Sequence, residues 1–513
     1  MREMLSRVQR ALCAMALAAA CLLLCALAAC GLLLTAHLTT QGGMSEFVQI
    51  ARDALLPNLV LTLAAIAALG LVSTALARFA RVRLTGILAA LWLIAAVAFL
   101  LGARTRQIYD PASVLEGARL FAQGNYKAME IDYFNACSYQ LGICLPMEVA
   151  LRVLPGLDIN LFMQAVNAFL SVASAGMLAA LCEVLAGKRA RHAAAALYLT
   201  CLPAAFYCAI VYSTLPMVFL CSCAFLCFAL YLQRRRLALA LACCACLAVA
   251  AMLKPNAAIP IAAIAVCAGV DFLASRDWKL MLCVLLGAAL AGLLVRGVVW
   301  QYELRGGVTL TPDMSMLARL AMGLQRGGGQ AGWYNRYIER FFPLEVTREQ
   351  ELAIAGADLR AQLSAFAADP ASLGAFLRDK LLSQSLEATY GTLWYGNLSE
   401  QTGPLAQAAR AVYAQGAPPR AAIERYMAIW QKAMYTLAAI GTAKTLCGRR
   451  WDAARLILPV TILGGFLYHM IFEAKSQYIY VYVLYMIPLA AQGLCALEAA
   501  AKAGLSRLRA GKP

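Results

Sequence analysis

Long apolar stretches with few charges run through this 513-residue chain and limit what it can fold into. A helix needs about 20 largely apolar residues to cross the hydrocarbon core of a bilayer. Backbone polar groups find no water there, so a helix, which pairs them internally, is the expected form. The sequence therefore predicts an all-α polytopic membrane protein with about twelve transmembrane helices, at 11–36, 56–77, 85–103, 162–186, 193–209, 215–232, 237–253, 256–274, 280–298, 427–443, 456–472 and 478–500.

The composition excludes the main alternatives. Hydrophobic residues make up 63% of the chain and charged residues 14%, whereas a soluble domain carries roughly 25% charged residues. Disordered, collagen-like, coiled-coil and nucleic-acid-binding classes are therefore excluded. The 19 cysteines lie mostly inside apolar runs, where cysteine behaves as a small hydrophobe. A disulfide between Cys137 and Cys144 stays an open alternative.

Basic residues predict how the helices are oriented, because cationic loops tend to stay in the cytoplasm. With the N-terminus inside, seven short loops and tails become cytoplasmic and hold 22 of the 44 lysines and arginines. The outward hairpins 210–214, 254–255 and 473–477 hold only Lys254 and Lys475. We expect both termini to lie in the cytoplasm of a plasma-membrane protein.

Two other stretches need separate interpretation. The apolar stretch 141–155 is short and contains Pro146, Glu148 and Arg152, so it predicts an interfacial or re-entrant helix. Leu27–Cys30 matches a lipoprotein cleavage site, but the apolar run continues beyond it. An uncleaved signal anchor is the favoured interpretation.

This topology divides the chain into five parts. Helical membrane regions at 1–103, 162–298 and 427–513 alternate with two long extracytoplasmic segments, 104–161 and 299–426. Long loops of this kind are usually functional. The second should contain amphipathic helices at 347–366 and 369–387, with Thr347 and Asp369 as N-caps.

Ionisable residues at the outer ends of the predicted helices are candidates for chemistry, because charge near the hydrocarbon is costly. Asp110 follows the third helix, Lys254 separates the seventh from the eighth, and Glu473 and Lys475 separate the eleventh from the twelfth. An acid that takes a proton from a hydroxyl, beside cations that hold a phosphate, suits transfer from a phosphate-linked donor. No phosphate-binding loop is present: Gly441–Thr445 lacks the required spacing.

Each candidate also has a structural alternative. Asp110-Pro111-Ala112-Ser113 is typical of a helix start with Asp as N-cap, and the same tetrapeptide recurs at Asp369. Lys254 could extend to lipid headgroups. Glu473 and Lys475 could be compensating charges in a turn, and Tyr139 with Gln140 could belong to an aromatic belt.

The order of these pieces resembles the GT-C membrane glycosyltransferases, specifically bacterial family-39-like enzymes related to protein O-mannosyltransferases and the lipid A aminoarabinose transferase. The similar segments cover most of the chain; they are Tyr109–Ala118, Tyr133–Gly142 with the following helix 143–155, Leu253-Lys254-Pro255, Ala321–Leu324, Gly332–Asn335 and Glu473–Tyr478. Three features depart from the family. Gln477 stands where many members have Arg, two extra helices precede the acidic loop, and 212–216 carries no acid.

The resemblance implies a GT-C-type helical bundle that moves a sugar from a polyprenyl-phosphate carrier to an extracytoplasmic acceptor, with inversion and without a metal or other cofactor. The acceptor class (protein, glycan or envelope polymer) stays open. The roles it implies are a general base, Asp110; donor phosphate binding by Lys254, Lys475, Gln477 and Tyr478; and a sugar or acceptor cleft lined by Glu473, Tyr133, Tyr139 and Gln140.

Two other functions fit a polytopic protein. A transporter or lipid-carrier flippase tends to show internal repeats and charges near the membrane midplane. This sequence shows no repeat between its halves, and its candidate charges gather at the outer face. A structural scaffold would leave the two long outer segments without a role.

Overall fold

The computed structural model of the chain is built mainly of helices and describes residues 2–41, 45–129, 132–310, 313–327, 330–342, 346–395, 397–398, 403–449 and 451–509. Within these ranges, nine helices are long and apolar enough to cross a membrane. They are α1 (Arg2–Leu33), α2 (Leu55–Arg78), α3 (Leu84–Ala103), α7 (Ile159–Ala186), α10 (Thr214–Arg234), α12 (Ala258–Ser275) with the short turn before it, α13 (Trp278–Gly306), α19 (Ala453–Ile471) and α20 (Ser476–Arg509).

The other three predicted spans have a different form. The stretch 237–253 is α11 (Leu237–Leu253), an apolar helix of 17 residues. The stretch 193–209 divides into α8 (Lys188–Leu199) and α9 (Leu202–Tyr207), because Cys201 between them is extended and Pro203 has no backbone N–H to continue the helix. The stretch 427–443 forms part of α18 (Pro418–Cys447), a 30-residue helix. The count of twelve crossings therefore stays a prediction.

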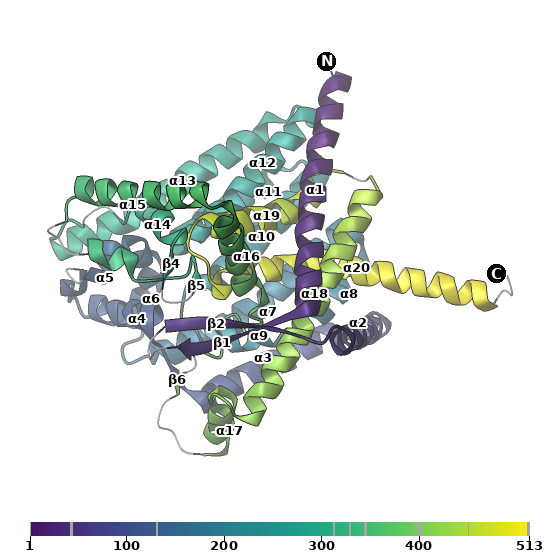
Figure 1. The fold of residues 1–513 in the computed structure, drawn as a ribbon, viewed down its shortest axis with the longest axis horizontal. Helices are drawn as coiled ribbons and strands as arrows, with labels where there is room; N and C mark the ends of the chain where they lie inside the picture. Colours follow the sequence, from purple (N-terminus) through teal and green to yellow (C-terminus); the bar gives the residue numbers. More distant parts are fainter. Residues whose placement is uncertain are drawn as a thin grey trace.

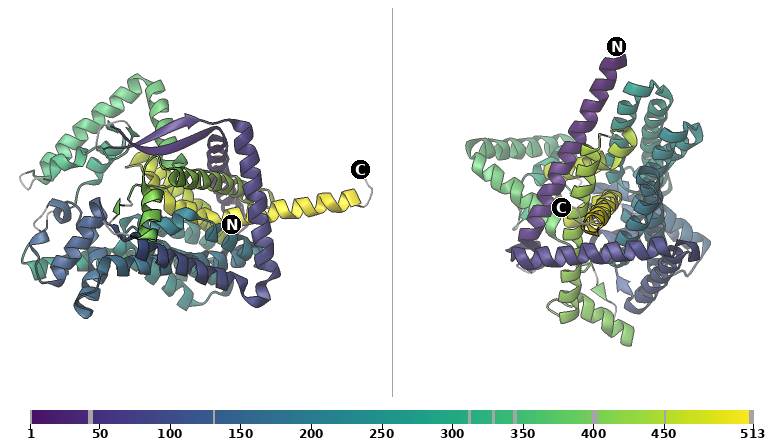
Figure 2. Two further views of the ribbon diagram at one scale, coloured as in Figure 1. Left: turned by 90° about the horizontal axis from the view of Figure 1, so that it is seen from below. Right: turned by 90° about the vertical axis from the view of Figure 1, so that its right-hand side faces the viewer.

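The helices pack into one bundle (Figures 1 and 2). α18 packs along α20, α10 along α7 and α11, and α11 along α13. A large buried core of aliphatic and aromatic side chains joins α7, α8, α10, α18 and α20. The N-terminal part of α1 and the C-terminal part of α20 project from the body of the protein (Figure 1).

A layer of shorter elements covers one end of the bundle. It contains α4 (Tyr109–Ala122), α5 (Asp132–Ala136), α6 (Leu141–Val153), α14 (Met316–Gly323), α15 (Arg348–Ala368), α16 (Pro370–Leu386) and α17 (Pro404–Tyr413). α6 has 13 residues, a length of about 20 Å that is too short to cross a bilayer core of about 30 Å. This length agrees with the interfacial helix expected at 141–155.

The helices predicted in the large outer segment are present. Thr347 forms a capping box with Gln350 at the start of α15, and Asp369 caps α16. Their expected amphipathic character is wrong for both helices. In α15, Glu351 is buried while Leu352 and Leu363 are exposed. The deviation is larger in α16. Its buried residues include Lys380, Ser383, Gln384 and Ser385, because the helix packs against polar backbone next to the 472–475 turn.

An unexpected β-hairpin follows α1. Strands β1 (Leu34–Gln41) and β2 (Ser45–Arg52) pair antiparallel, so residues 34–36 belong to a strand and not to the first predicted helix. Ala36, Leu38 and Val48 are buried against side chains of α16 and Trp333. Alternation of buried and exposed residues is what a half-buried strand requires. The hairpin crosses the outer layer close to α16 (Figure 1).

Candidate active site

Asp110 lies in the first turn of α4 and does not cap it. The N-cap position of α4 is Ile108, which makes no side-chain cap hydrogen bond. At Asp369, by contrast, the carboxylate accepts hydrogen bonds from the backbone N–H of Ala371 at 3.1 Å and of Ser372 at 3.2 Å. The structure thus contradicts the cap alternative for Asp110. Tyr109, just before it, has φ +54°, a conformation that strains a residue with a Cβ.

The Asp110 carboxylate stays accessible to solvent although protein groups surround it. Tyr212 Oη donates to Asp110 Oδ2 over a long 3.5 Å. Burial raises the pKa of the Asp110 carboxyl above its usual value, while nearby Lys475 and Lys254 oppose that shift. An accessible carboxylate with a raised pKa is well suited to accept a proton.

Lys254 is the buried cation on one side of this carboxylate. It ends α11 with its side chain 8% exposed. Its Nζ donates to Thr214 Oγ1 at 3.1 Å and lies 4.3 Å from the centroid of the Tyr212 ring. No carboxylate of the described ranges lies within ion-pair distance of Nζ. Burial lowers the pKa of Lys254 to about 8, and Asp110 acts in the opposite direction.

Lys475 is the second buried cation, and it is already paired. Its Nζ forms an ion pair with Glu46 of β2 and donates to Tyr395 Oη at 2.8 Å. Burial disfavours the charged amine, but Glu46 and Tyr395 outweigh this effect and raise the pKa of Lys475 above its usual value. Glu46 was not predicted as a site residue.

The rest of the 473–478 turn contributes an acid and a phenol. Tyr478 Oη donates to Glu473 Oε1 at 3.1 Å. Burial raises the pKa of the partly exposed Glu473 carboxyl, and Lys475 opposes the shift. Gln477 is buried beside Tyr207 at the start of α20. Tyr207 in turn donates to Thr214, the partner of Lys254, at 3.2 Å.

Gln140 and Tyr133, which were also predicted as site residues, lie near Tyr212 and Asp110. Gln140 Nε2 donates to Tyr212 Oη, which links η3 (Ser138–Gln140) to the Asp110 contact. Tyr133 Oη is buried and has no hydrogen-bond partner in the described part of the chain. Its neighbours include Tyr212 and Asp110. Tyr133 therefore offers a free hydroxyl beside the carboxylate.

The third cation of the site is Arg319 of α14. Its guanidinium carbon lies 5.5 Å from the centroid of the Tyr139 ring. Burial lowers the pKa of Arg319, but Tyr139 and Cys137, the largest opposing neighbours, together with Glu473 raise it above the usual value. None of the ion pairs in the described residues involves Arg319. The sequence signal was one arginine inside the apolar run 316–324.

Close backbone contacts hold these elements together. A Cβ at Gly142 would lie 1.8 Å from the Met252 carbonyl oxygen, and one at Gly323 would lie 2.5 Å from the Phe472 carbonyl carbon. Glycine at these positions lets α6 approach the Lys254 turn and lets α14 approach the Glu473 turn. Lys380 Nζ adds hydrogen bonds to the carbonyls of Gly323 at 2.5 Å and Phe472 at 2.6 Å. Burial lowers the pKa of this lysine to about 7.

The structure therefore brings Asp110, Lys254, Lys475 and Glu473 into one electrostatic neighbourhood. Sequence reasoning missed Glu46, Tyr212, Thr214, Arg319 and Tyr395. Tyr212 and Thr214 lie in the stretch 212–216, which carries no acid. Glu46 and Tyr395 carried no sequence signal that connects them to Lys475.

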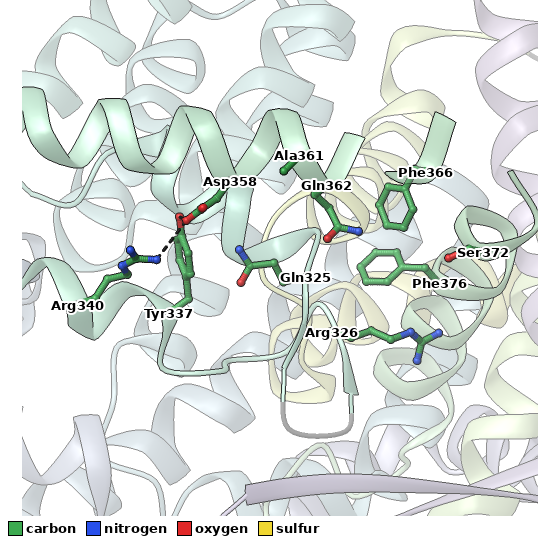
Figure 3. Close-up of a pocket in the computed structure, with 10 residues that line it drawn as sticks. All are labelled: Gln325, Arg326, Tyr337, Arg340, Asp358, Ala361, Gln362, Phe366, Ser372 and Phe376. Atoms are coloured by element: carbon green, nitrogen blue, oxygen red, sulfur yellow. Dashed lines mark hydrogen bonds and ion pairs between the residues drawn. The ribbon is translucent and has the colours of Figure 1, made fainter. Parts of the chain in front are cut away.

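A separate pocket of about 650 Å³ lies in the outer layer between α15, α16 and η5 (Tyr337–Phe341) (Figure 3). Arg340, Asp358 and Phe376 are among its lining residues, and Arg340 pairs with Asp358 at 3.2 Å. None of the predicted site residues lines this pocket. We assign the chemistry to the Asp110 neighbourhood, because the free cations and the accessible acid are there.

The described residues contain no group of three or more His, Cys, Asp or Glu side chains that could hold a metal ion. Cys137 and Cys144 are both free thiols, so the disulfide alternative is wrong.

Comparison with known proteins gives one structural likeness to report. No family model matches the chain, and no curated protein matches it. Among solved structures, the chain is similar to the archaeal oligosaccharyltransferase AglB from Archaeoglobus fulgidus, solved in complex with an inhibitory peptide and a dolichol-phosphate. The identity is 12% and the TM-score 0.42, over 84% of this chain and 52% of AglB. This chain thus spans about half the length of that protein.

Proposed function

We propose that this protein is an integral-membrane glycosyltransferase, with a GT-C-type bundle, that moves a sugar from a polyprenyl-phosphate donor to an extracytoplasmic acceptor. One observation carries the proposal: an accessible carboxylate, Asp110, lies near Lys254, a buried cation that has no carboxylate partner within ion-pair distance in the described residues. A second cation without such a partner, Arg319, lies beside Tyr139, another residue near Asp110. A base beside unpaired cations is what a transfer from a phosphate-linked donor requires.

Asp110 acts as the general base. It takes the proton of an acceptor hydroxyl while the acceptor oxygen attacks the anomeric carbon of the donor sugar. The bond between that carbon and the phosphate oxygen breaks, and its electron pair leaves with the polyprenyl phosphate. A single displacement of this kind inverts the anomeric centre. The raised pKa of Asp110 makes it a stronger proton acceptor than an ordinary surface aspartate.

Lys254 and Arg319 stabilise the phosphate as its negative charge grows, so the proposed step uses no metal. Thr214 and Tyr212 hold Lys254 in place, and Tyr139 lies beside Arg319. Lys475 and Tyr478 complete the phosphate side of the site. Gln477 is the weakest of the predicted phosphate ligands, because it carries no charge and lies beside Tyr207.

The acceptor side of the proposed site contains Tyr133, Gln140 and Glu473. Tyr133 Oη lacks a partner in the described chain and can bond a sugar or acceptor hydroxyl. Glu473 is held by Tyr478 at 3.1 Å. The segment 299–426, which supplies α14, α15 and α16, lies beside this side of the site.

Reconstituted vesicles test the proposal. The purified protein receives a polyprenyl-phosphate-linked radiolabelled sugar and cell-envelope acceptors on the same face. A transferase yields labelled acceptor and free polyprenyl phosphate, and Asp110→Asn yields neither. Movement of the labelled lipid between leaflets with no labelled acceptor would identify a flippase and overturn the proposal.

A further inference from the structure

Glu46 forms an ion pair with Lys475, one of the cations that the proposed donor site needs. Its carboxylate pairs with Lys475 Nζ, and Tyr395 Oη donates to the same carboxylate at 3.5 Å. We propose that Glu46 is a built-in substitute for the donor phosphate: it neutralises Lys475 in the empty site, and donor binding displaces it. The inference rests on the proposed function and adds a gating residue to it.

The balance of charge supports this exchange. Three cations, Lys254, Lys475 and Arg319, face three carboxylates, those of Asp110, Glu473 and Glu46. The empty site is thus close to neutral at neutral pH. A donor phosphate adds negative charge, and like charges at short range repel strongly where water is scarce. Movement of one carboxylate out of the site restores the balance between positive and negative charges.

Glu46 is the carboxylate that can leave most easily. Asp110 is fixed in the first turn of α4, and Glu473 lies in a turn anchored on both sides. Glu46 lies in β2, two residues before Val48, which is buried against α16, so the side chain of Glu46 and not the strand has to move. This side chain is partly exposed. In the described part of the chain, its side chain contacts Lys475 and accepts the long hydrogen bond from Tyr395.

Lys475 stays in place when Glu46 moves. Its Nζ also donates to Tyr395 Oη at 2.8 Å, and the next residue, Ser476, donates to the buried Glu387 carboxylate at 2.7 Å. The amine therefore keeps its position and exchanges one anion for another. Glu46 acts through Lys475, so it is a gating residue and not a catalytic one.

This exchange predicts a specific effect on affinity. A phosphate must compete with Glu46 for Lys475, so removal of the Glu46 charge should tighten phosphate binding. If Glu46 only stabilised the structure, removal of its charge would destabilise the hairpin and weaken phosphate binding. The two roles thus predict opposite signs.

The test uses the full chain in lipid nanodiscs, with farnesyl phosphate as the probe and farnesol as its uncharged counterpart. Glu46→Gln should bind farnesyl phosphate about tenfold more tightly than the wild type, equivalent to one ion pair. Farnesol binding should not change. Glu46→Asp keeps the charge and should behave as the wild type. In the background Lys475→Met, Glu46→Gln should give no gain, since the two changes act on one contact.

Asp53→Asn is the matched control. Asp53 pairs with Lys432 at 3.0 Å just after the same hairpin, outside the site, so its loss should leave the affinity for farnesyl phosphate unchanged. Wild-type binding of the phosphate with no tightening in Glu46→Gln would overturn this inference alone. If neither protein preferred farnesyl phosphate over farnesol, the proposed function itself would be overturned.

Discussion

Asp110 and Asp369 begin the same tetrapeptide, Asp-Pro-Ala-Ser, yet their carboxylates have different environments. Asp369 accepts two backbone N–H bonds, whereas Asp110 faces Tyr212 and lies near two lysines. Identical local sequence therefore gives a cap in one place and an accessible acid in the other. The difference comes from the elements packed around each helix start.

Asparagine separates these two roles, because it caps helices well but cannot accept a proton as a base. We expect Asp110→Asn to keep near-normal expression and lose transfer by at least about a hundredfold. Asp369→Asn should keep both its expression and its transfer activity. Asp369→Ala should lose about 0.5–2 kcal/mol of stability. Transfer assays and thermal unfolding measure these effects. Equal activity of the two Asn variants would remove Asp110 from the mechanism.

Two titrating groups should shape the pH profile of kcat/KM, which reports the free enzyme. Asp110 must be deprotonated, and its raised pKa places the acidic limb above the usual range of aspartate. Lys254 must be protonated, and its pKa of about 8 places the alkaline limb there, with activity lost as pH rises. Lys254→Arg stays charged, so its alkaline limb should move to higher pH. If the alkaline limb of Lys254→Arg stayed at the wild-type pH, a group other than Lys254 would be responsible for it.

At the scale of the helices, close backbone contacts that leave no room for an added atom position the site residues. α6 begins where Gly142 meets the Met252 carbonyl, two residues before Lys254. We expect Gly142→Ala to push α6 away from this turn, at a cost of about 1–3 kcal/mol for overpacking. Donor affinity should fall with stability, as thermal unfolding and transfer at limiting donor can show.

Gly374→Ala is the control for this change. Gly374 lies in α16 with open space around its Cβ position, so alanine should stabilise the helix slightly, as helix propensity predicts. Unchanged donor affinity in Gly142→Ala would mean that the α6 contact does not position Lys254.

The sequence predicted the helices well because bilayer length and internal hydrogen bonding leave few other forms for a long apolar run. It missed the hairpin 34–52, whose short alternation of Ala36, Leu38 and Val48 directly follows a helix. Gly42-Gly43 in the sequence was the available turn signal. Without that hairpin, no sequence argument could place Glu46 against Lys475.

At the scale of the whole molecule, the position of α6 relative to the membrane decides the orientation of everything after it. α6 has 13 residues and carries Glu148, buried at 1% exposure and paired with Arg152 at 2.9 Å and Arg305 at 2.6 Å. A crossing helix would place this ionic cluster within the hydrocarbon, where charge is costly. α6 is therefore expected to lie at the outer interface.

A pair of reporters tests this topology, one inserted after Gly156 and one after Gly187, both at exposed positions that flank α7. If α6 does not cross, the Gly156 reporter is extracytoplasmic and the Gly187 reporter, beside Lys188, Arg189 and Arg191, is cytoplasmic. If α6 crosses, both signals exchange sides. α7 has 28 residues, about 42 Å of helix, so the two reporters must lie on opposite faces in either case. Protease protection of intact spheroplasts provides the measurement. An external signal after Gly187 would place the turns of Lys254 and Lys475, which follow α6, on the face opposite Asp110, which precedes it, and would overturn the proposed site.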